Sequence, residues 1–123
     1  MPKTRKPGIR WVRVARVSDV PRGQVRGVEA EGRKLALVNR DGEWFALDAV
    51  CPHQGGPLDE GSLWQGAVEC PWHHYRFDPA TGKNLYPADV YPEDMPQLQA
   101  DVQPVETFPV DVRGEEVFVG LPG

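Results

Sequence analysis

Apolar and polar residues alternate in short runs along this chain, and no run keeps the 3.6-residue period of an amphipathic helix over three turns. Alternation over a few residues predicts β-strands, because successive strand side chains point to opposite faces. The clearest unit is residues 34–48, where two apolar runs flank Asp41-Gly42. Glycine tolerates the positive φ of a tight turn, so this unit is predicted to be a β-hairpin. Further strands are predicted at residues 9–14 and 24–29, at 64–70 paired with 75–78, and in a terminal hairpin of 110–112 with 117–119.

These elements predict an all-β fold, an antiparallel sandwich or small barrel. The chain has 13 glycines and 13 prolines, which favours short strands and loops over long helices. Residues 83–109 break the pattern with five prolines and several acidic side chains. We expect a long excursion there, with one short helical turn near residues 95–100. The aromatic residues expected in the core are Trp11, Trp44, Phe45, Phe77 and Phe118.

Length and charge limit the possible function. The 123 residues suit one domain, predicted over residues 9–123 after a basic tail of residues 1–8. Residues 1–16 hold six basic residues and no acid, whereas the rest of the chain holds eight basic and 18 acidic residues. An acidic body repels phosphates, so nucleic acid is not an expected partner. No apolar run fits a signal peptide or a spanning helix, so we expect a soluble, cytoplasmic protein that does not bind membranes.

All the sulfur and imidazole ligands of the chain lie in one window. The sequence reads CPHQGGPL from Cys51 and CPWHH from Cys70, so that C-x-H is followed, after sixteen residues, by C-x-x-H. Both cysteines and all three histidines fall between residues 51 and 74. Thiolate suits iron in a sulfide-bridged cluster, and imidazole raises the potential of the iron that it binds. If both loops hold one cluster, the two cysteines can bind one iron and two histidines the other.

The two boxes resemble the cluster-binding boxes of Rieske proteins, closely over residues 40–83. The resemblance implies a two-loop cluster-binding subdomain, with loops 51–58 and 70–78, that holds one [2Fe–2S] cluster. By position, Cys51 and Cys70 would bind the inner iron and His53 and His73 the outer iron. The residues expected around the cluster are Gly55, Gly56, Leu58, Trp72 and Tyr75.

The departures from the family pattern indicate which class of Rieske protein this chain resembles. Rieske proteins of respiratory quinol-oxidising complexes carry an extra disulfide-bonded cysteine in each box, where this chain has Gly56 and Trp72. They also carry Ser and Tyr where this chain has Tyr75 and Phe77. Without both hydroxyl hydrogen bonds the reduced cluster is less stabilised, which is typical of the low-potential ferredoxins of oxygenase systems. We therefore predict a potential towards the bottom of the range of roughly −150 to +300 mV. His74 occupies a position that is commonly glycine.

Two other interpretations of the ligand window remain open at this point. A Cys2His2 zinc site would use the same atoms and make the chain a zinc-stapled binding module, although structural zinc usually takes C-x2–4-C or H-x3–5-H pairs. A disulfide between the cysteines would leave His53 and His73 unexplained. His74, the histidine outside the spacing, is expected at the surface.

The remaining residues indicate an electron carrier and no enzyme. An oxygenase needs a second iron held by two histidines and a carboxylate, and His74 is the one histidine left over. No glycine-rich dinucleotide fingerprint is present either. The expected function is one-electron transfer from a reductase to a terminal oxygenase or similar acceptor. The alternative is a small Rieske subunit of a larger reductase, such as nitrite reductase.

Overall fold

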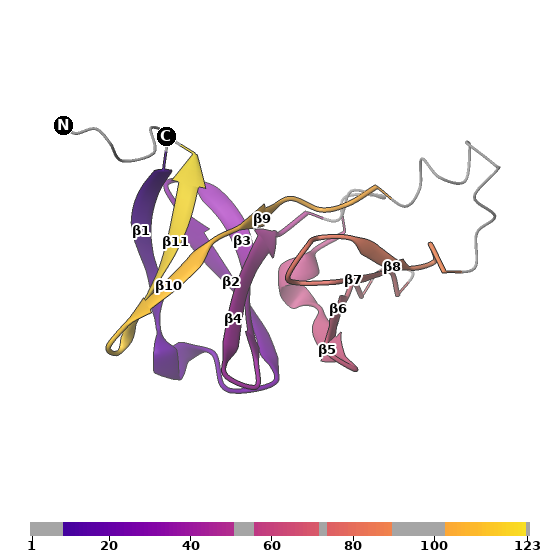
Figure 1. Ribbon diagram of the computed structural model, residues 1–123, viewed down its shortest axis with the longest axis horizontal. Coiled ribbons are helices and arrows are strands. Elements are labelled where there is room, and N and C mark those ends of the chain that lie inside the picture. Colours follow the sequence, from indigo (N-terminus) through magenta and orange to yellow (C-terminus); the bar gives the residue numbers. More distant parts are fainter. Residues whose placement is uncertain (1–8, 51–55, 72–73, 90–102, 123) are drawn as a thin grey trace.

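The computed structural model describes residues 9–50, 56–71, 74–89 and 103–122. Within these ranges the regular secondary structure is strand, apart from two single-turn 3₁₀ helices, η1 (Val17–Asp19) and η2 (Leu58–Glu60) (Figure 1). The predicted all-β fold is therefore confirmed. The strands are β1 (Ile9–Arg16), β2 (Gln24–Ala30), β3 (Arg33–Arg40), β4 (Glu43–Asp48), β5 (Ser62–Trp64), β6 (Ala67–Glu69), β7 (Arg76–Phe77), β8 (Asn84–Tyr86), β9 (Thr107–Phe108), β10 (Val110–Arg113) and β11 (Glu116–Pro122).

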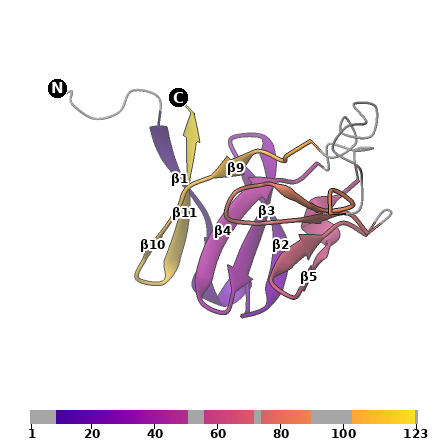
Figure 2. The ribbon, with the colours of Figure 1, turned by 45° about the vertical axis from the view of Figure 1, so that its right-hand side comes forward.

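The described strands form three antiparallel sheets. One has the order β1-β11-β10, the second β2-β3-β4-β9 and the third β5-β6-β7-β8. The first two sheets form a base, and the third lies beside the base at the end away from β1 (Figures 1 and 2). The second sheet therefore lies between the other two and is covered on both faces.

Strand β3 shows why the middle sheet is buried twice. Its residues Leu35, Ala36, Leu37 and Val38 are all fully buried. Leu35 and Leu37 pack into a core shared with β1, β9 and β11, while Ala36 and Val38 pack into a core shared with η2, β6 and β7. Because side chains alternate along a strand, a continuous apolar run of this kind marks a strand buried on both faces.

The two predicted hairpins, β3–β4 and β10–β11, are confirmed, and each has a left-handed backbone at its turn. Strands β3 and β4 pair from Arg40↔Glu43 outwards, and Asp41 and Gly42 between them have φ of 55° and 97°. The turn of the β10–β11 hairpin contains Gly114 with φ of 61°. The single strand expected over residues 64–70 is corrected to two strands, β5 and β6, because Gln65 and Gly66 form a turn with φ of 50° and 84°; β6 pairs with β7 as predicted. Positive φ at the first central residue, or at both, gives the twist that two-residue hairpins require.

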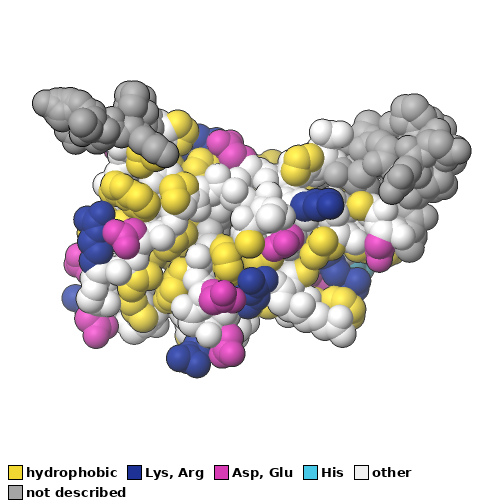
Figure 3. Space-filling model, in the orientation of Figure 1, with side chains coloured by type: hydrophobic (Ala, Val, Ile, Leu, Met, Phe, Trp, Pro, Cys, Tyr) yellow, Lys and Arg dark blue, Asp and Glu magenta, His cyan; other side chains and the backbone are white. Residues whose placement is uncertain are grey.

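Two further expectations about the fold are corrected. Residues 83–109 are not a loop throughout, because strand β8 lies near the start of this segment and strand β9 near its end. The helical turn predicted near residues 95–100 lies outside the described residues, and so does the tail of residues 1–8. Phe77 is fully buried as expected, but Trp11 is 41% exposed. Trp11 lies opposite Gly120 of β11, and Figure 3 shows several hydrophobic side chains at the surface over this sheet. Over the part of the chain that is described, no helix is long and apolar enough to cross a membrane.

Candidate metal centre

The structure describes one of the four predicted ligands, Cys70. It directly follows β6 and is fully buried. Of the residues expected around the cluster, Leu58 and Tyr75 are also buried, at 0% and 6% exposure, and so is Gly56. The other predicted residues of the site lie outside the described ranges: Cys51, His53, Gly55, Trp72 and His73. The full ligand set therefore stays a prediction, while the described residues define where both of its loops begin and end.

The first loop is closed at its base between β4 and η2. Val50 and Pro57 form an isolated antiparallel bridge, and the Leu58 N–H donates to the Ala49 carbonyl at 2.7 Å. On the β4 side, the Asp48 carboxylate accepts a hydrogen bond from the Val50 N–H at 3.1 Å. The segment with the predicted ligands Cys51 and His53 therefore starts and ends at hydrogen-bonded backbone.

The second loop is closed in the same way between β6 and β7. The Cys70 N–H donates to the Tyr75 carbonyl at 2.7 Å, which joins the two ends of the segment that carries His73. Strands β6 and β7 pair directly below this bond, through Glu69↔Arg76. A strand pair on one side and a backbone hydrogen bond on the other fix the direction in which this loop leaves the sheet.

The bases of the two loops meet in one hydrophobic core. Leu58 from the first loop and Cys70 and Tyr75 from the second belong to the same buried cluster. The cluster also contains Val68 and Phe77 from the third sheet and residues of the middle sheet. The two ligand loops predicted from the sequence therefore start and end at one shared hydrophobic core. Two loops that bind the same cofactor need such a common support.

The donor chemistry fits an iron–sulfur cluster. A buried cysteine is a poor site for a free anion, but a thiolate bound to iron has its charge neutralised by the metal. Cys70 is fully buried at the base of its loop, which agrees with a cysteine-bound inner iron. The described residues therefore fit the sulfur half of the predicted site.

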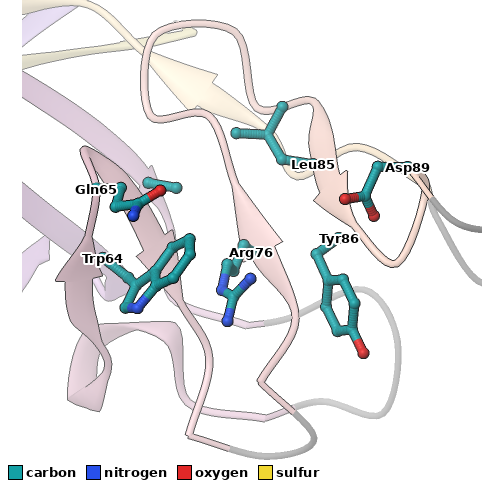
Figure 4. Close-up of a pocket in the computed structure, with 7 residues that line it drawn as sticks. Trp64, Gln65, Arg76, Leu85, Tyr86 and Asp89 are labelled. Atoms are coloured by element: carbon teal, nitrogen blue, oxygen red, sulfur yellow. The ribbon is translucent and has the colours of Figure 1, made fainter.

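Glu69, the residue before Cys70, is held by its side chain as well as by the sheet. Arg76 Nε donates to Glu69 Oε2 at 3.2 Å, and the Arg76 guanidinium lies 3.8 Å from the ring centre of Trp64 and 5.1 Å from that of Tyr86. Figure 4 shows the guanidinium between the two rings, in a shallow pocket of about 180 Å³ also lined by Gln65, Ala67, Leu85 and Asp89. The guanidinium is therefore fixed by stacking on both sides as well as by its ion pair.

Sequence reasoning missed this stack. Arg76 and Tyr86 are paired across β7 and β8, and Trp64 reaches Arg76 from β5, so the contact depends on the order of the strands in the sheet. The sequence signal nearest to this stack was the alternation around residues 64–70. It predicts strand structure but does not indicate which strands are neighbours in the sheet.

His74 behaves as a surface residue, as expected. Its side chain is 71% exposed, and its Nδ1 lies 3.6 Å from Glu69 Oε2, too far for a hydrogen bond. Its backbone φ is 59°, in the left-handed region that glycine adopts without steric cost. This conformation explains why glycine is common at the position in the family that the sequence resembles.

The chain is similar to known proteins over most of its length. Residues 10–109 match the family described as the Rieske [2Fe–2S] domain. The chain is 34% identical over 112 residues to the ferredoxin component of the naphthalene 1,2-dioxygenase system of Pseudomonas aeruginosa, a match that covers 91% of this chain and 96% of that protein. It is 40% identical over 111 residues to the ferredoxin component of the naphthalene 1,2-dioxygenase/salicylate 5-hydroxylase systems of a Ralstonia species, covering 90% and 95%.

A solved structure gives the same result for the fold. A chain in the complex of reduced oxygenase and oxidized ferredoxin of carbazole 1,9a-dioxygenase superposes with a TM-score of 0.70 at 28% identity. The match covers 89% of this chain and 91% of that chain. These relatives are ferredoxin components, which are electron carriers and not catalytic enzymes.

Proposed function

The chain belongs to the Rieske [2Fe–2S] domain family, and from that membership we propose that it passes single electrons from a reductase to a terminal oxygenase. The observation that carries this proposal is the near full-length match to ferredoxin components of dioxygenase systems, over 91% of this chain and 96% of one such relative. The closed bases of the two loops, which share one core, support it from the structure.

We assign the ligands by position: Cys51 and Cys70 to the inner iron, His53 and His73 to the outer iron. When bound, the cluster supplies one-electron redox chemistry, with a potential set by its ligands and their hydrogen bonds. The described residues provide its support. Leu58, at the end of the first loop, and Tyr75, at the end of the second, belong to the same buried core as Cys70, and this core excludes water from the Cys70 side of the site.

The low predicted potential follows from the residues after the second loop. Phe77 is fully buried and its ring carries no hydroxyl, so it donates no hydrogen bond to a ligand sulfur. Such hydrogen bonds stabilise the reduced state and raise the potential. We therefore propose a low-potential carrier, and a measured potential well above zero would contradict this.

A set of single variants tests the ligand assignment. Replacing a ligand, as in Cys70→Ser or His73→Ala, is expected to reduce the iron and acid-labile sulfide of the purified protein to about a tenth or less. His74→Gly is the matched control, because His74 is the adjacent histidine, is exposed, and has a backbone that suits glycine. The assignment fails if His74→Gly loses the cluster while His73→Ala keeps it. Iron-free, zinc-containing protein without sulfide would support the zinc-stapled alternative.

Electron transfer is tested with the components of a dioxygenase system. We expect the reduced protein to be oxidised by the oxygenase component of a naphthalene 1,2-dioxygenase system and to be reduced again by its reductase, in stopped-flow absorbance. The His73→Ala variant controls for direct transfer between the other components. A holoprotein that neither component reacts with would contradict the proposal. Stable co-purification with a large reductase subunit would instead favour the small-subunit alternative.

Two further parts of the proposal concern organisation. We propose one domain over residues 9–123, with residues 1–8 as a basic tail, and a cytoplasmic location. Limited proteolysis that leaves one resistant fragment supports the domain, while two fragments of similar stability would contradict it. Cell fractionation tests the location.

A further inference from the structure

Gly61 makes a close backbone approach between the two loop bases. It follows η2 and precedes β5, and it faces the carbonyl of Glu69, the residue before Cys70. A Cβ at Gly61 would lie 2.1 Å from the Glu69 carbonyl oxygen and 3.1 Å from both the Glu69 carbonyl carbon and the Leu58 carbonyl oxygen. Two of these three atoms belong to the backbone of the second loop's base, so no side-chain rotation can make room for a methyl group.

The requirement for glycine at this position is one of space. Gly61 has φ of −80° and ψ of −166°, an extended conformation that alanine adopts without strain. Gly82 differs, because its φ of 78° would strain any other residue as well. A Gly61→Ala substitution therefore tests the close approach alone.

The contact links both predicted ligand loops through backbone atoms. On one side, the Gly61 N–H donates to the Leu58 carbonyl at 3.0 Å, and the Leu58 N–H donates to Ala49 at 2.7 Å, which closes the first loop. On the other side, Glu69 leads directly into Cys70, whose N–H closes the second loop. Glu69 cannot easily move away, since its side chain is bound to Arg76.

We propose that Gly61 is a positioning residue that sets the spacing between the two ligand loops. The inference rests on the ligand assignment proposed above. Real Cβ atoms essentially never approach closer than 3.0 Å, whereas the Gly61 Cβ would lie at 2.1 Å, so the backbone must separate by at least the difference, 0.9 Å. Metal–ligand distances tolerate only about 0.2 Å, so this displacement would leave the two loops unable to bind one cluster with normal geometry.

The test compares Gly61→Ala with Gly114→Ala in the full chain. Gly114 lies in the β10–β11 turn with open space around it and φ of 61°, so alanine there strains the backbone without any clash. We expect Gly61→Ala to lower the iron and sulfide content about tenfold, the size typical of losing a group that orients metal ligands. The cluster that remains should show altered EPR g values. Gly114→Ala should lose some thermal stability and keep the wild-type cluster content and spectrum.

A readout that does not depend on the cluster separates this inference from the ligand assignment. Hydrogen–deuterium exchange by mass spectrometry should show faster exchange in Gly61→Ala for the Leu58 and Cys70 amides, which close the two loops. The Gly120 amide, which donates to Pro109 at 2.9 Å in the base, should be unchanged. If wild-type protein holds no sulfide, the ligand assignment fails while this exchange result still tests the spacing role.

The inference is overturned by either of two results. The first is a Gly61→Ala protein that holds a full cluster with wild-type g values and shows unchanged hydrogen exchange at both loop bases. The second is a Gly61→Ala protein that loses protection from exchange throughout, including faster exchange of the Gly120 amide in the base. The second result would make Gly61 a general stability residue, because the proposed role is confined to the loop bases.

Discussion

Leu58→Ala should be among the most damaging conservative changes in the chain. Leu58 is fully buried beneath the first loop, and its neighbours in the core lie on hydrogen-bonded strands of the middle and third sheets. Those strands cannot collapse into the space left by the deleted carbons, so both the lost burial and the cavity destabilise the fold. Leu→Ala substitutions of this kind cost about 3 kcal/mol of unfolding free energy, within a range of roughly 2.7 to 5.

The assay is urea unfolding of the holoprotein under anaerobic conditions, followed by tryptophan fluorescence and visible absorbance together. With a slope of about 1.5 kcal/mol per M, a loss of about 3 kcal/mol lowers the midpoint by about 2 M urea. The visible absorbance should disappear over the same range of urea, because Leu58 and Cys70 belong to the same core.

Leu85→Ala is the matched control, the same substitution in the same part of the fold. Leu85 lies on β8 and is 41% exposed, so we expect a cost of about 1 kcal/mol or less and a midpoint shift below about 0.7 M. The reasoning is refuted if the two variants shift the midpoint equally. It is also refuted if Leu58→Ala unfolds well after its cluster is lost, since the loop base would then not be part of the common core.

Two other predictions concern the base of the fold. Asn39→Ala should lower the unfolding free energy by about 2 kcal/mol in the same urea assay. The buried amide of Asn39 donates a hydrogen bond to the Val20 carbonyl and accepts one from the Gly42 N–H, both at 2.8 Å, and the substitution removes both. A loss below about 0.5 kcal/mol would contradict this prediction. The hydrogen bond from Arg10 lowers the pKa of Glu31, so this pair stabilises the fold at neutral pH and loses its effect as the pH falls below about 4.3. Glu31→Gln should therefore lower Tm at pH 7 and lower it progressively less as the pH falls further below about 4.3, and an equal decrease at every pH would exclude the ion pair as the cause.

The local elements of the fold were predictable because turn chemistry determines them. Asp41-Gly42 predicted its hairpin, since its positive φ values suit those residues, and the apolar run of β3 was visible as a strand. The burial of β3 on both faces was not predicted, because it depends on which elements cover each face of the middle sheet. The ligand spacing in the sequence likewise indicated two loops, and the shared core beneath them appears only in the structure.

Trp11 shows why reasoning from residue type alone failed. Aromatic residues in strands are usually buried, but β1 directs Val12 and Val14 towards the core and Trp11 outwards. On the outer face, Trp11 lies opposite Gly120, and a Cβ on Gly120 would come 3.3 Å from the indole ring. The indole therefore helps to bury the backbone at Gly120, a role that the register with β11 creates and that the sequence of β1 does not reveal.

The most direct test of the account is the EPR spectrum of the dithionite-reduced protein. A [2Fe–2S] cluster bound by two cysteines and two histidines has a lower average g value than a cluster bound by four cysteines, so one spectrum tests both the cofactor and its histidine ligands. We predict a rhombic signal with this lower average, which is retained in His74→Gly and lost in His73→Ala. An average g typical of four-cysteine ligation, or a protein with no signal and no acid-labile sulfide, would contradict the account.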